Sequence, residues 1–452
     1  MATGAEPDSR PITVKSLIPS AFLPAMIFEI GNGAMAPILA LTALHLGASP
    51  KTAGFTLSLL GIGQILGDVP AAALANRVGD RRAMVIAATL ALVAQLSCVV
   101  APTVILLDVA LLVIGMSTAV FYLARQAYLT EVVSVGIRAR AMSTLGGSHR
   151  IGLFIGPFIG AAAIHFVGLH GAYFVAVVAS ALTGLVLVIV PDLPGSRAAG
   201  PASGGVRIVQ MVADHRRLFA TLGLAVVTVA AVRAARQTVL PLWAEHLGLS
   251  AEQTSLIFGI ASAVDMSLFY PSGKVMDRQG RLFIAVPAML IMGASMMALP
   301  LAHGALMLTV LAMMMSVGNG IGSGIMMTLG ADVAPAEGRL PFLSVWRVMS
   351  DAGNAAGPVV VSVVATLSSL AAGIVTIGAL GPLASLGLTW WVPRYSTFAT
   401  RRMVRAHRSR SASSVPAQPH GPPLPPGPSP AGTSMSRSSM SRPSAPHGPP
   451  QA

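Results

Sequence analysis

The sequence predicts an all-α membrane protein in which twelve transmembrane helices form two pseudo-symmetric six-helix bundles. Of its 452 residues, 54% are hydrophobic and 10% are charged, and the mean hydropathy of +0.73 is too high for a soluble protein of this length. Twelve apolar runs are each long enough to cross a hydrocarbon core of about 30 Å as a helix. Polar and turn-forming residues also recur 201 positions apart, which indicates that one six-helix unit occurs twice.

Each half of the chain contains six of the expected spans. They cover 17–44, 52–75, 83–102, 104–130, 141–167 and 171–191 in the first half, and 218–245, 252–275, 282–302, 304–331, 341–367 and 370–392 in the second. The predicted bundles are therefore 17–191 and 218–392, joined by a cytoplasmic linker over 192–217. Residues 1–16 form a cytoplasmic segment without the apolar core of a cleaved signal peptide. The tail over 393–452 is basic at first and then rich in Pro, Ser and Gly, so we expect its end to be disordered.

The repeat is clearest at positions that general hydrophobicity would not keep in register. Asn76-Arg77-Val78-Gly79 recurs as Asp277-Arg278-Gln279-Gly280, and His45-Leu46-Gly47 recurs as His246-Leu247-Gly248. Charges, glycines and turns held at one offset favour two copies of a single helical unit over a shared composition.

The formal net charge of +13 is distributed unevenly between alternate loops. Arginines gather in the loops of one side, whereas the expected loops of the other side offer only Lys51. Because basic loops remain in the cytoplasm, this asymmetry predicts that both termini are cytoplasmic, in a bacterial plasma or inner membrane. The arginines are then placed to bind anionic lipid headgroups, and we expect no nucleic-acid partner.

The sequence shows no pattern that is typical of an enzyme's catalytic site. Cys98 is its single cysteine, which excludes a disulfide within one chain. No metal-ligand cluster, phosphate-binding loop or pair of nucleophile and base stands out. We therefore expect no metal, no cofactor and no enzymatic activity.

Two loops combine a glycine with neighbouring charges. They read Asn76-Arg77-Val78-Gly79-Asp80-Arg81-Arg82 after the second span and Gly273-Lys274-Val275-Met276-Asp277-Arg278-Gln279-Gly280-Arg281 after the eighth. Both resemble the G-x-x-x-D-R-x-G-R-R motif of the Major Facilitator Superfamily, and residues 17–392 are similar to its twelve-helix drug/proton antiporters. The resemblance implies that these loops latch the two bundles together on the cytoplasmic side. The latch candidates are Asp68, Asn76, Arg77, Gly79, Arg81, Asp277, Arg278, Gly280 and Arg281.

The sequence departs from that family at three positions. Asn76 stands where the family carries an acid, Asp80 stands where it carries a base, and Leu111 stands where proton-linked members carry an arginine. Arg125 lies in the same span, but its 14-residue separation from Leu111 is about 21 Å of helical rise, so it is no direct replacement.

The fifth and eleventh spans share a glycine and proline pattern that predicts close helix packing. The positions are Gly152, Gly156, Pro157 and Gly160 in the fifth span and Gly353, Gly357 and Pro358 in the eleventh. Glycines four residues apart lie on one helix face and let a second helix approach, while a proline bends the helix. This pattern resembles the antiporter signature of the family, where it favours export.

Ionisable side chains inside the spans are candidates for function, because burying a charge in a bilayer costs at least about 2 kcal/mol. Helical rise places three acids and three bases deep in their spans: Glu29, Asp265 and Asp351, and Arg150, Arg233 and Arg236. We expect the acids to carry protons. The arginines, with Asn32, Gln64 and Asn319, are candidates for binding substrate.

Other charged residues have a structural interpretation as well. Arg150 and Asp351 occupy equivalent positions in the repeat and could instead neutralise each other as a buried pair. Arg125 and Arg347 lie near enough to the cytoplasmic boundary to reach the interface.

Three functions are consistent with these observations. The first is a monomeric, proton-driven exporter of small amphipathic compounds that works by alternating access. The second is a carrier for an organic anion that uses Arg150, Arg233 and Arg236 as ligands. The third is a membrane scaffold or sensor that transports nothing and recruits partners through its basic tail.

Overall fold

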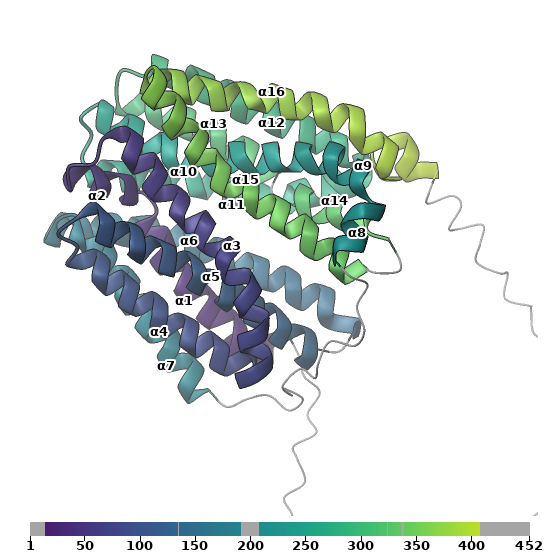
Figure 1. The fold of residues 1–452 in the computed structure, drawn as a ribbon, viewed down its shortest axis with the longest axis horizontal. Coiled ribbons are helices and arrows are strands. Elements are labelled where there is room, and N and C mark those ends of the chain that lie inside the picture. Colours follow the sequence, from purple (N-terminus) through teal and green to yellow (C-terminus); the bar gives the residue numbers. More distant parts are fainter. Residues whose placement is uncertain (1–13, 134, 191–207, 323, 336–338, 407–452) are drawn as a thin grey trace, which may run out of the picture. The chain divides into compact units, whose positions relative to one another are not determined.

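The computed structural model describes residues 14–133, 135–190, 208–322, 324–335 and 339–406, and every regular element in these ranges is a helix (Figure 1). This confirms the predicted all-α class. Most of the predicted linker and the tail expected to be disordered lie outside the described residues.

The helices of the first half follow the expected spans. They are η1 (Val14–Leu17), η2 (Ile18–Phe22), α1 (Leu23–Met35), α2 (Leu39–His45), α3 (Pro50–Val78), α4 (Asp80–Val99), α5 (Val104–Val132), α6 (Val135–Val167) and α7 (His170–Ile189). We call α1 to α7 the first bundle.

The second half repeats this arrangement. Its elements are α8 (Ile208–Asp214), α9 (Arg216–Leu218), η3 (Phe219–Gly223), α10 (Leu224–His246), α11 (Ala251–Gln279), α12 (Arg281–Ala298), η4 (Leu299–Leu301), α13 (Ala305–Ile321), α14 (Ile325–Val333), α15 (Arg339–Leu367) and α16 (Leu370–Tyr395). We call α10 to α16 the second bundle.

Ten stretches of the described chain are long and apolar enough to span a membrane, or eleven if the bent stretch over η2, α1 and α2 counts as one span. The remaining predicted span, 52–75, coincides with α3, a helix of 29 residues that carries Gln64 and Asp68. At a rise of about 1.5 Å per residue, this helix is also long enough to cross a bilayer.

Two spans that the sequence predicts as continuous are broken. The span 17–44 bends by 40° between α1 and α2, where Pro37 lies in the turn, and 304–331 is interrupted between α13 and α14. Proline lacks the backbone donor that a helix needs, and Gly320, Gly322 and Gly324 weaken the second helix at its break.

The 201-residue repeat extends to details of the backbone. Two π-helical turns, Ile18–Phe22 and Phe219–Gly223, begin equivalent spans. The side chains of Ser49 and Ser250 cap the helices that follow each first span. Equivalent turns thus have the same local structure in both halves.

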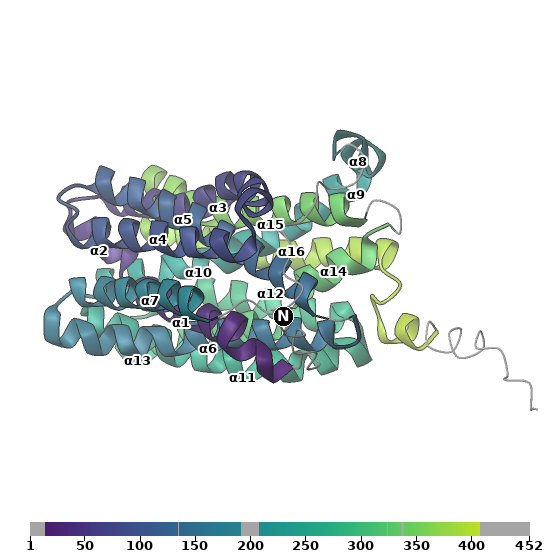
Figure 2. The same cartoon turned by 90° about the horizontal axis from the view of Figure 1, so that it is seen from below.

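In the described residues, two pairs of helices provide most of the contact between the two bundles. Within the first bundle α1 packs against α6 and α7, and α3 packs against α5; within the second, α10 packs against α15, and α12 against α16. Across the interface α3 packs against α15 and α6 packs against α11 (Figures 1 and 2). Part of the α6 face that points away from its own bundle therefore lies against α11, whereas other side chains of this helix, such as Ile159 and Phe166, are exposed.

Candidate functional site

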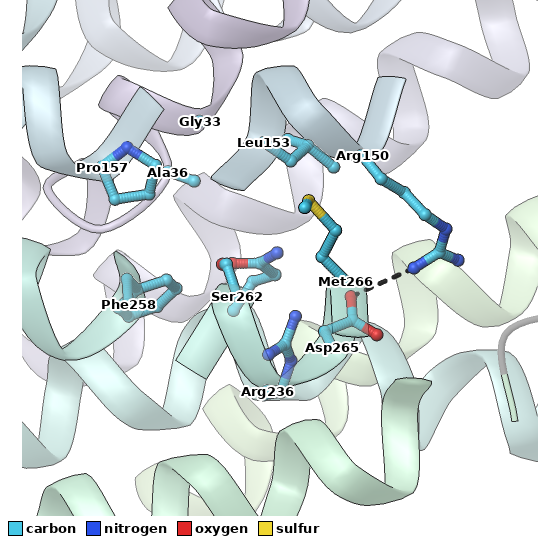
Figure 3. Close-up of a pocket in the computed structure, with 11 residues that line it drawn as sticks. Gly33, Ala36, Arg150, Leu153, Pro157, Arg236, Phe258, Ser262, Asp265 and Met266 are labelled. Atoms are coloured by element: carbon cyan, nitrogen blue, oxygen red, sulfur yellow. Dashed lines mark hydrogen bonds and ion pairs between the residues drawn. The ribbon is translucent and has the colours of Figure 1, made fainter. Parts of the chain in front are cut away.

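A cavity lies between the bundles where α6 faces α11 (Figure 3). Its volume is about 40 Å³, and its lining comes from both bundles: Gly33, Ala36, Arg150, Leu153, Pro157, Arg236, Gln237, Phe258, Ser262, Asp265 and Met266. One part of this wall is apolar and the other is charged, so the cavity suits a ligand with both characters.

Arg150 and Asp265 form an ion pair across the cavity. Nη1 of Arg150 lies 3.3 Å from Oδ2 of Asp265, and both side chains are largely buried. The guanidinium also lies over the ring of Phe269, 4.1 Å from its centroid. The sequence-based pairing of Arg150 with Asp351 is therefore wrong, because α6 packs against α11 whereas Asp351 lies on α15, which packs against α3.

Two further arginines surround the same carboxylate. Arg233 and Arg236 are one turn apart on α10, and both interact electrostatically with Asp265 and with Arg150. Nη1 of Arg233 donates to the carbonyl oxygen of Gly322 at the break between α13 and α14, at 2.8 Å. Three guanidinium groups around one carboxylate leave two positive charges in excess when all four are ionised.

Some polar atoms at this site have no protein partner. Within the described part of the chain, Nε of Arg236 and Oδ1 of Asp265 are buried without a hydrogen bond, although Nη1 of Arg236 donates to Ser316 at 2.8 Å. Leaving such groups unpaired costs about 1–3 kcal/mol each, so a ligand that satisfied them would gain affinity.

Glu29 belongs to a second cluster, which lies inside the first bundle. Its side chain is 1% exposed, Oε1 accepts a hydrogen bond from the hydroxyl of Tyr122, and the same oxygen lies 3.0 Å from Nδ1 of His149. Nδ2 of Asn32 donates to Oε2 at 3.4 Å. The sequence predicted that Asn32 lies one turn from Glu29, but it did not indicate that Tyr122 on α5 and His149 on α6 converge there.

Arg125 belongs to this cluster too. The expectation that its head group reaches the membrane interface is wrong: the residue is 7% exposed, and its guanidinium lies 4.9 Å from the centroid of the Tyr122 ring and close enough to Glu29 for electrostatic attraction. Arg125 follows Tyr122 by three residues on α5, so both point to the same face. That spacing was the available signal in the sequence.

A third charged cluster joins α3 to α15. Nη2 of Arg347 lies 3.0 Å from Oδ1 of Asp68, and Nε of the same residue lies 3.6 Å from Oδ2 of Asp351. Arg347 therefore links the bundles, a role that its expected place near the membrane boundary did not indicate. Asp68 and Asp351, predicted as a latch residue and a proton carrier, meet at one guanidinium.

The remaining substrate candidates lie outside the cavity wall. Asn32, Gln64, Arg233 and Asn319 are absent from its lining, although Asn32 contacts Glu29 and Arg233 interacts with Asp265. Asn319 is 8% exposed within α13. Direct contact of these four with substrate stays a prediction.

The loop motifs bind within their own bundles. In the first, Nε of Arg81 donates to the carbonyl oxygen of Leu187 at the end of α7, at 2.6 Å. In the second, Nε of Arg281 lies 2.9 Å from Asp332 and Nη1 lies 3.1 Å from Asp277. Arg77 and Arg278 are exposed, Gly79 and Gly280 have φ of 86° and 97°, and the side chain of Asn76 is outside the described set. A latch between bundles stays a prediction for these loops.

The glycine motifs lie at helix contacts. A Cβ atom added at Gly152 or Gly156 would lie 2.5 Å from atoms of α1, and one at Gly160 would lie 3.1 Å from Ala34. Gly353 and Gly357 face α10 in the same way, at Val227 and Ala231. Pro157 and Pro358 lie inside the same helices, α6 and α15.

A metal centre is not formed by the described residues, where no group of three or more His, Cys, Asp or Glu side chains is arranged to hold an ion.

Comparison with known proteins assigns the fold. The sequence matches the model of the Major Facilitator Superfamily over residues 21–358 and 222–412. No curated protein matches it in sequence.

Several solved structures are similar. A POT family transporter in complex with a thioalcohol-conjugated peptide has a TM-score of 0.72 at 13% identity, covering 84% of this chain and 96% of its own. A D-xylose–proton symporter has a TM-score of 0.66 at 15% identity, covering 86% and 98%. The human organic anion transporter MFSD10 has a TM-score of 0.59 at 16% identity, covering 83% and 99%. With the family model matching most of its length, this chain belongs to the Major Facilitator Superfamily and is a membrane transporter, not an enzyme.

Proposed function

We propose that the protein is a secondary carrier that couples protons to the movement of a small amphipathic organic anion. The observation that carries this proposal is the excess of positive charge around Asp265, where Arg150, Arg233 and Arg236 converge. Buried charges are stable only when they are paired, so this arrangement favours a substrate that brings a carboxylate or phosphate.

The rest of the cavity favours an apolar body on that anion. Leu153, Pro157, Phe258 and Met266 line it beside the charged residues (Figure 3). The sequence suggested amphipathic cargo and anionic cargo as separate alternatives, and this cavity supports both properties in one molecule. A substrate anion would compete with Asp265 for Arg150 and thereby loosen an ion pair that holds α6 to α11.

Glu29 is the proton site in this proposal. It is buried among Tyr122, His149 and Arg125, and protonation would remove its negative charge from a site closed to water. The two bundles would then rock about the cavity, as in other carriers built from repeated bundles. The fold is shared with a proton symporter and with an organic anion transporter, which supports both parts of the proposal, while the similarity to antiporters favours export.

Ligand binding to the purified protein tests the anion. Thermal unfolding would be followed in detergent with aryl carboxylates, aryl phosphates and cationic dyes. We expect the anions to stabilise the wild type and to lose this effect in Arg236→Gln, because that residue lines the cavity. Arg278→Gln is the control, since Arg278 is exposed in the last turn of α11 and does not line the cavity. Stabilisation by cationic dyes alone, or anion binding that survives Arg236→Gln, would refute an anionic substrate and support export of cations instead.

Transport by reconstituted protein tests proton coupling. We expect a pH gradient to drive accumulation of a bound anion in proteoliposomes. Glu29→Gln should abolish this accumulation and retain exchange of labelled for unlabelled anion, because exchange needs the substrate site and not the proton. Gradient-driven accumulation by Glu29→Gln would exclude Glu29 as the proton site.

A further inference from the structure

We propose that His149 passes protons between solvent and Glu29, and that its neighbour Arg150 links this exchange to the substrate. The coupling part rests on the proposed function, whereas the proton exchange can be tested without any substrate. The inference starts from two consecutive residues of α6 that contact different partners: His149 meets Glu29 on α1, and Arg150 meets Asp265 on α11.

The exposure of the cluster indicates the route of the proton. The side chain of Glu29 is 1% exposed and that of His149 is 32% exposed, with Nδ1 of the imidazole 3.0 Å from Oε1 of the carboxylate. The imidazole thus contacts the buried acid through one nitrogen while part of its ring reaches the accessible surface. Its ring also meets that of Tyr122 edge-on at 5.6 Å, which fixes its orientation.

The other groups that face Glu29 are unsuited to exchanging protons near neutral pH. Asn32 from α1 does not titrate, and Tyr122 and Arg125 from α5 are of types that ordinarily keep their protons below about pH 10. Imidazole is the side chain type that gains and loses a proton between about pH 5 and 8. His149 from α6 is therefore the group in this cluster that fits the task.

The net effect of the transfer is to move one proton from solvent to Glu29 through the imidazole. In the starting state a neutral imidazole has its proton on Nδ1, the nitrogen that lies 3.0 Å from Oε1 of Glu29. A proton from water binds Nε2, and the Nδ1 proton then moves to Oε1. The products are a neutral carboxylic acid and a neutral imidazole protonated on Nε2, so the cluster has taken up one proton.

The substrate acts on the same helical turn. Figure 3 shows Arg150 extending from α6 to Asp265, so an anion that binds Arg150 changes the contact between α6 and α11. One residue earlier, protonation of Glu29 changes the contact between α6 and α1. Gly146 and Gly147 precede this turn, and added Cβ atoms there would meet nothing within 4 Å, which leaves α6 room to adjust.

A pH jump followed by infrared absorption tests the proton route in the full-length protein without substrate. The carboxylic-acid band of Glu29 is identified by its loss in Glu29→Gln. We expect His149→Asn to slow the rise of this band by at least about 100-fold, as for loss of a positioned acid or base. The asparagine amide can occupy the position of Nδ1, so contact with Glu29 is kept. His165→Asn is the control, since His165 is 62% exposed near the other end of α6. If the carboxylic-acid band of Glu29 rises at the wild-type rate in His149→Asn, the proposal is overturned. If His149→Asn unfolds, the same measurement is made on His149→Gln.

Binding of 2-naphthoate tests the coupling. We expect the wild-type dissociation constant to differ about tenfold between about pH 6 and about pH 8, and His149→Asn to bind with a constant that no longer depends on pH. A pH dependence that persists in His149→Asn overturns the coupling role. If neither protein binds this anion or any aryl carboxylate, the proposed function fails, while the infrared result still decides whether His149 serves Glu29.

Discussion

The guanidinium of Arg347 on α15 binds the carboxylate of Asp68 on α3 and so ties the two bundles together. The distance from Nη2 to Oδ1 is 3.0 Å, and Nε of the same guanidinium lies 3.6 Å from Asp351. Both carboxylates are 14% exposed. Two acids thus share one base, and the cluster carries an excess negative charge when all three groups are ionised.

Removing that base should destabilise the protein. Arg347→Ala leaves two nearly buried carboxylates facing each other. We expect the free energy of unfolding to fall by about 1–3 kcal/mol, and by an amount near the lower value because Arg347 itself is 37% exposed. Asp351→Asn leaves one acid for one base and should be as stable as the wild type or more so. Thermal unfolding in detergent measures both, and equal losses in the two variants would contradict this account of the cluster.

The contact of α6 with α1 depends on Gly156. A methyl group there would lie 2.5 Å from the carbonyl oxygen of Ile30 and 2.8 Å from the backbone nitrogen of Ala34. Gly156→Ala should therefore push the helices apart and cost about 1–3 kcal/mol in unfolding free energy.

Gly147→Ala is the matched control on the same helix. An added Cβ there meets nothing within 4 Å, and alanine favours a helix over glycine by up to about 1 kcal/mol. The expected order of melting temperature is Gly147→Ala at or above the wild type and Gly156→Ala below it. The reverse order would show that α1 and α6 do not pack as described.

The sequence predicted the helices well because long apolar runs and a strict repeat are strong signals. It also drew attention to charged residues such as Glu29 and Asp265, since a charge in an apolar run is easily seen, but it placed the buried Arg125 at the membrane interface. Their partners could not be predicted, because pairing depends on which helices become neighbours. Arg150 meets Asp265 and not Asp351 for this reason.

Residues of ordinary types were the hardest to recognise. Tyr122 and His149 contact Glu29, but a tyrosine and a histidine in or near a membrane helix carry no signature that distinguishes them from packing residues. The helix breaks after Met35 and Ile321 were also missed, because apolar composition continues through them. Local backbone geometry at proline and glycine has to be seen in three dimensions.

Arg281 should stabilise the second bundle more than its neighbour Arg278. Its guanidinium binds both oxygens of Asp332, at 2.9 and 3.3 Å, and both side chains are 9% exposed. Arg281→Ala leaves a buried carboxylate without its cation, at a cost of about 3–5 kcal/mol. Arg278→Ala removes an exposed side chain and should change the free energy of unfolding by less than about 0.5 kcal/mol. Similar melting temperatures for the two variants would argue against the bidentate pair.

Two equivalent glycines differ in their surroundings, so the same substitution should have unequal effects. Gly79 and Gly280 both combine a positive φ with a ψ of 154° or 166°, a conformation almost exclusive to glycine, in which alanine is strained by about 1–3 kcal/mol. A Cβ at Gly79 meets nothing within 4 Å, whereas one at Gly280 would lie 2.7 Å from the carbonyl carbon of Thr400.

Proteolysis of the segment that follows α16 should reveal this difference between the two glycines. Backbone nitrogens of Arg281 and Leu282 donate to the carbonyl oxygens of Phe398 and Ala399, which holds this segment against the loop. Gly280→Ala should displace it and speed trypsin cleavage after Arg401, which Gly79→Ala should leave unchanged. Both variants should lose stability through backbone strain, but only Gly280→Ala should also release the segment, because only there does the added methyl group collide with another part of the backbone. Equal cleavage rates would mean that the segment is not held by this loop.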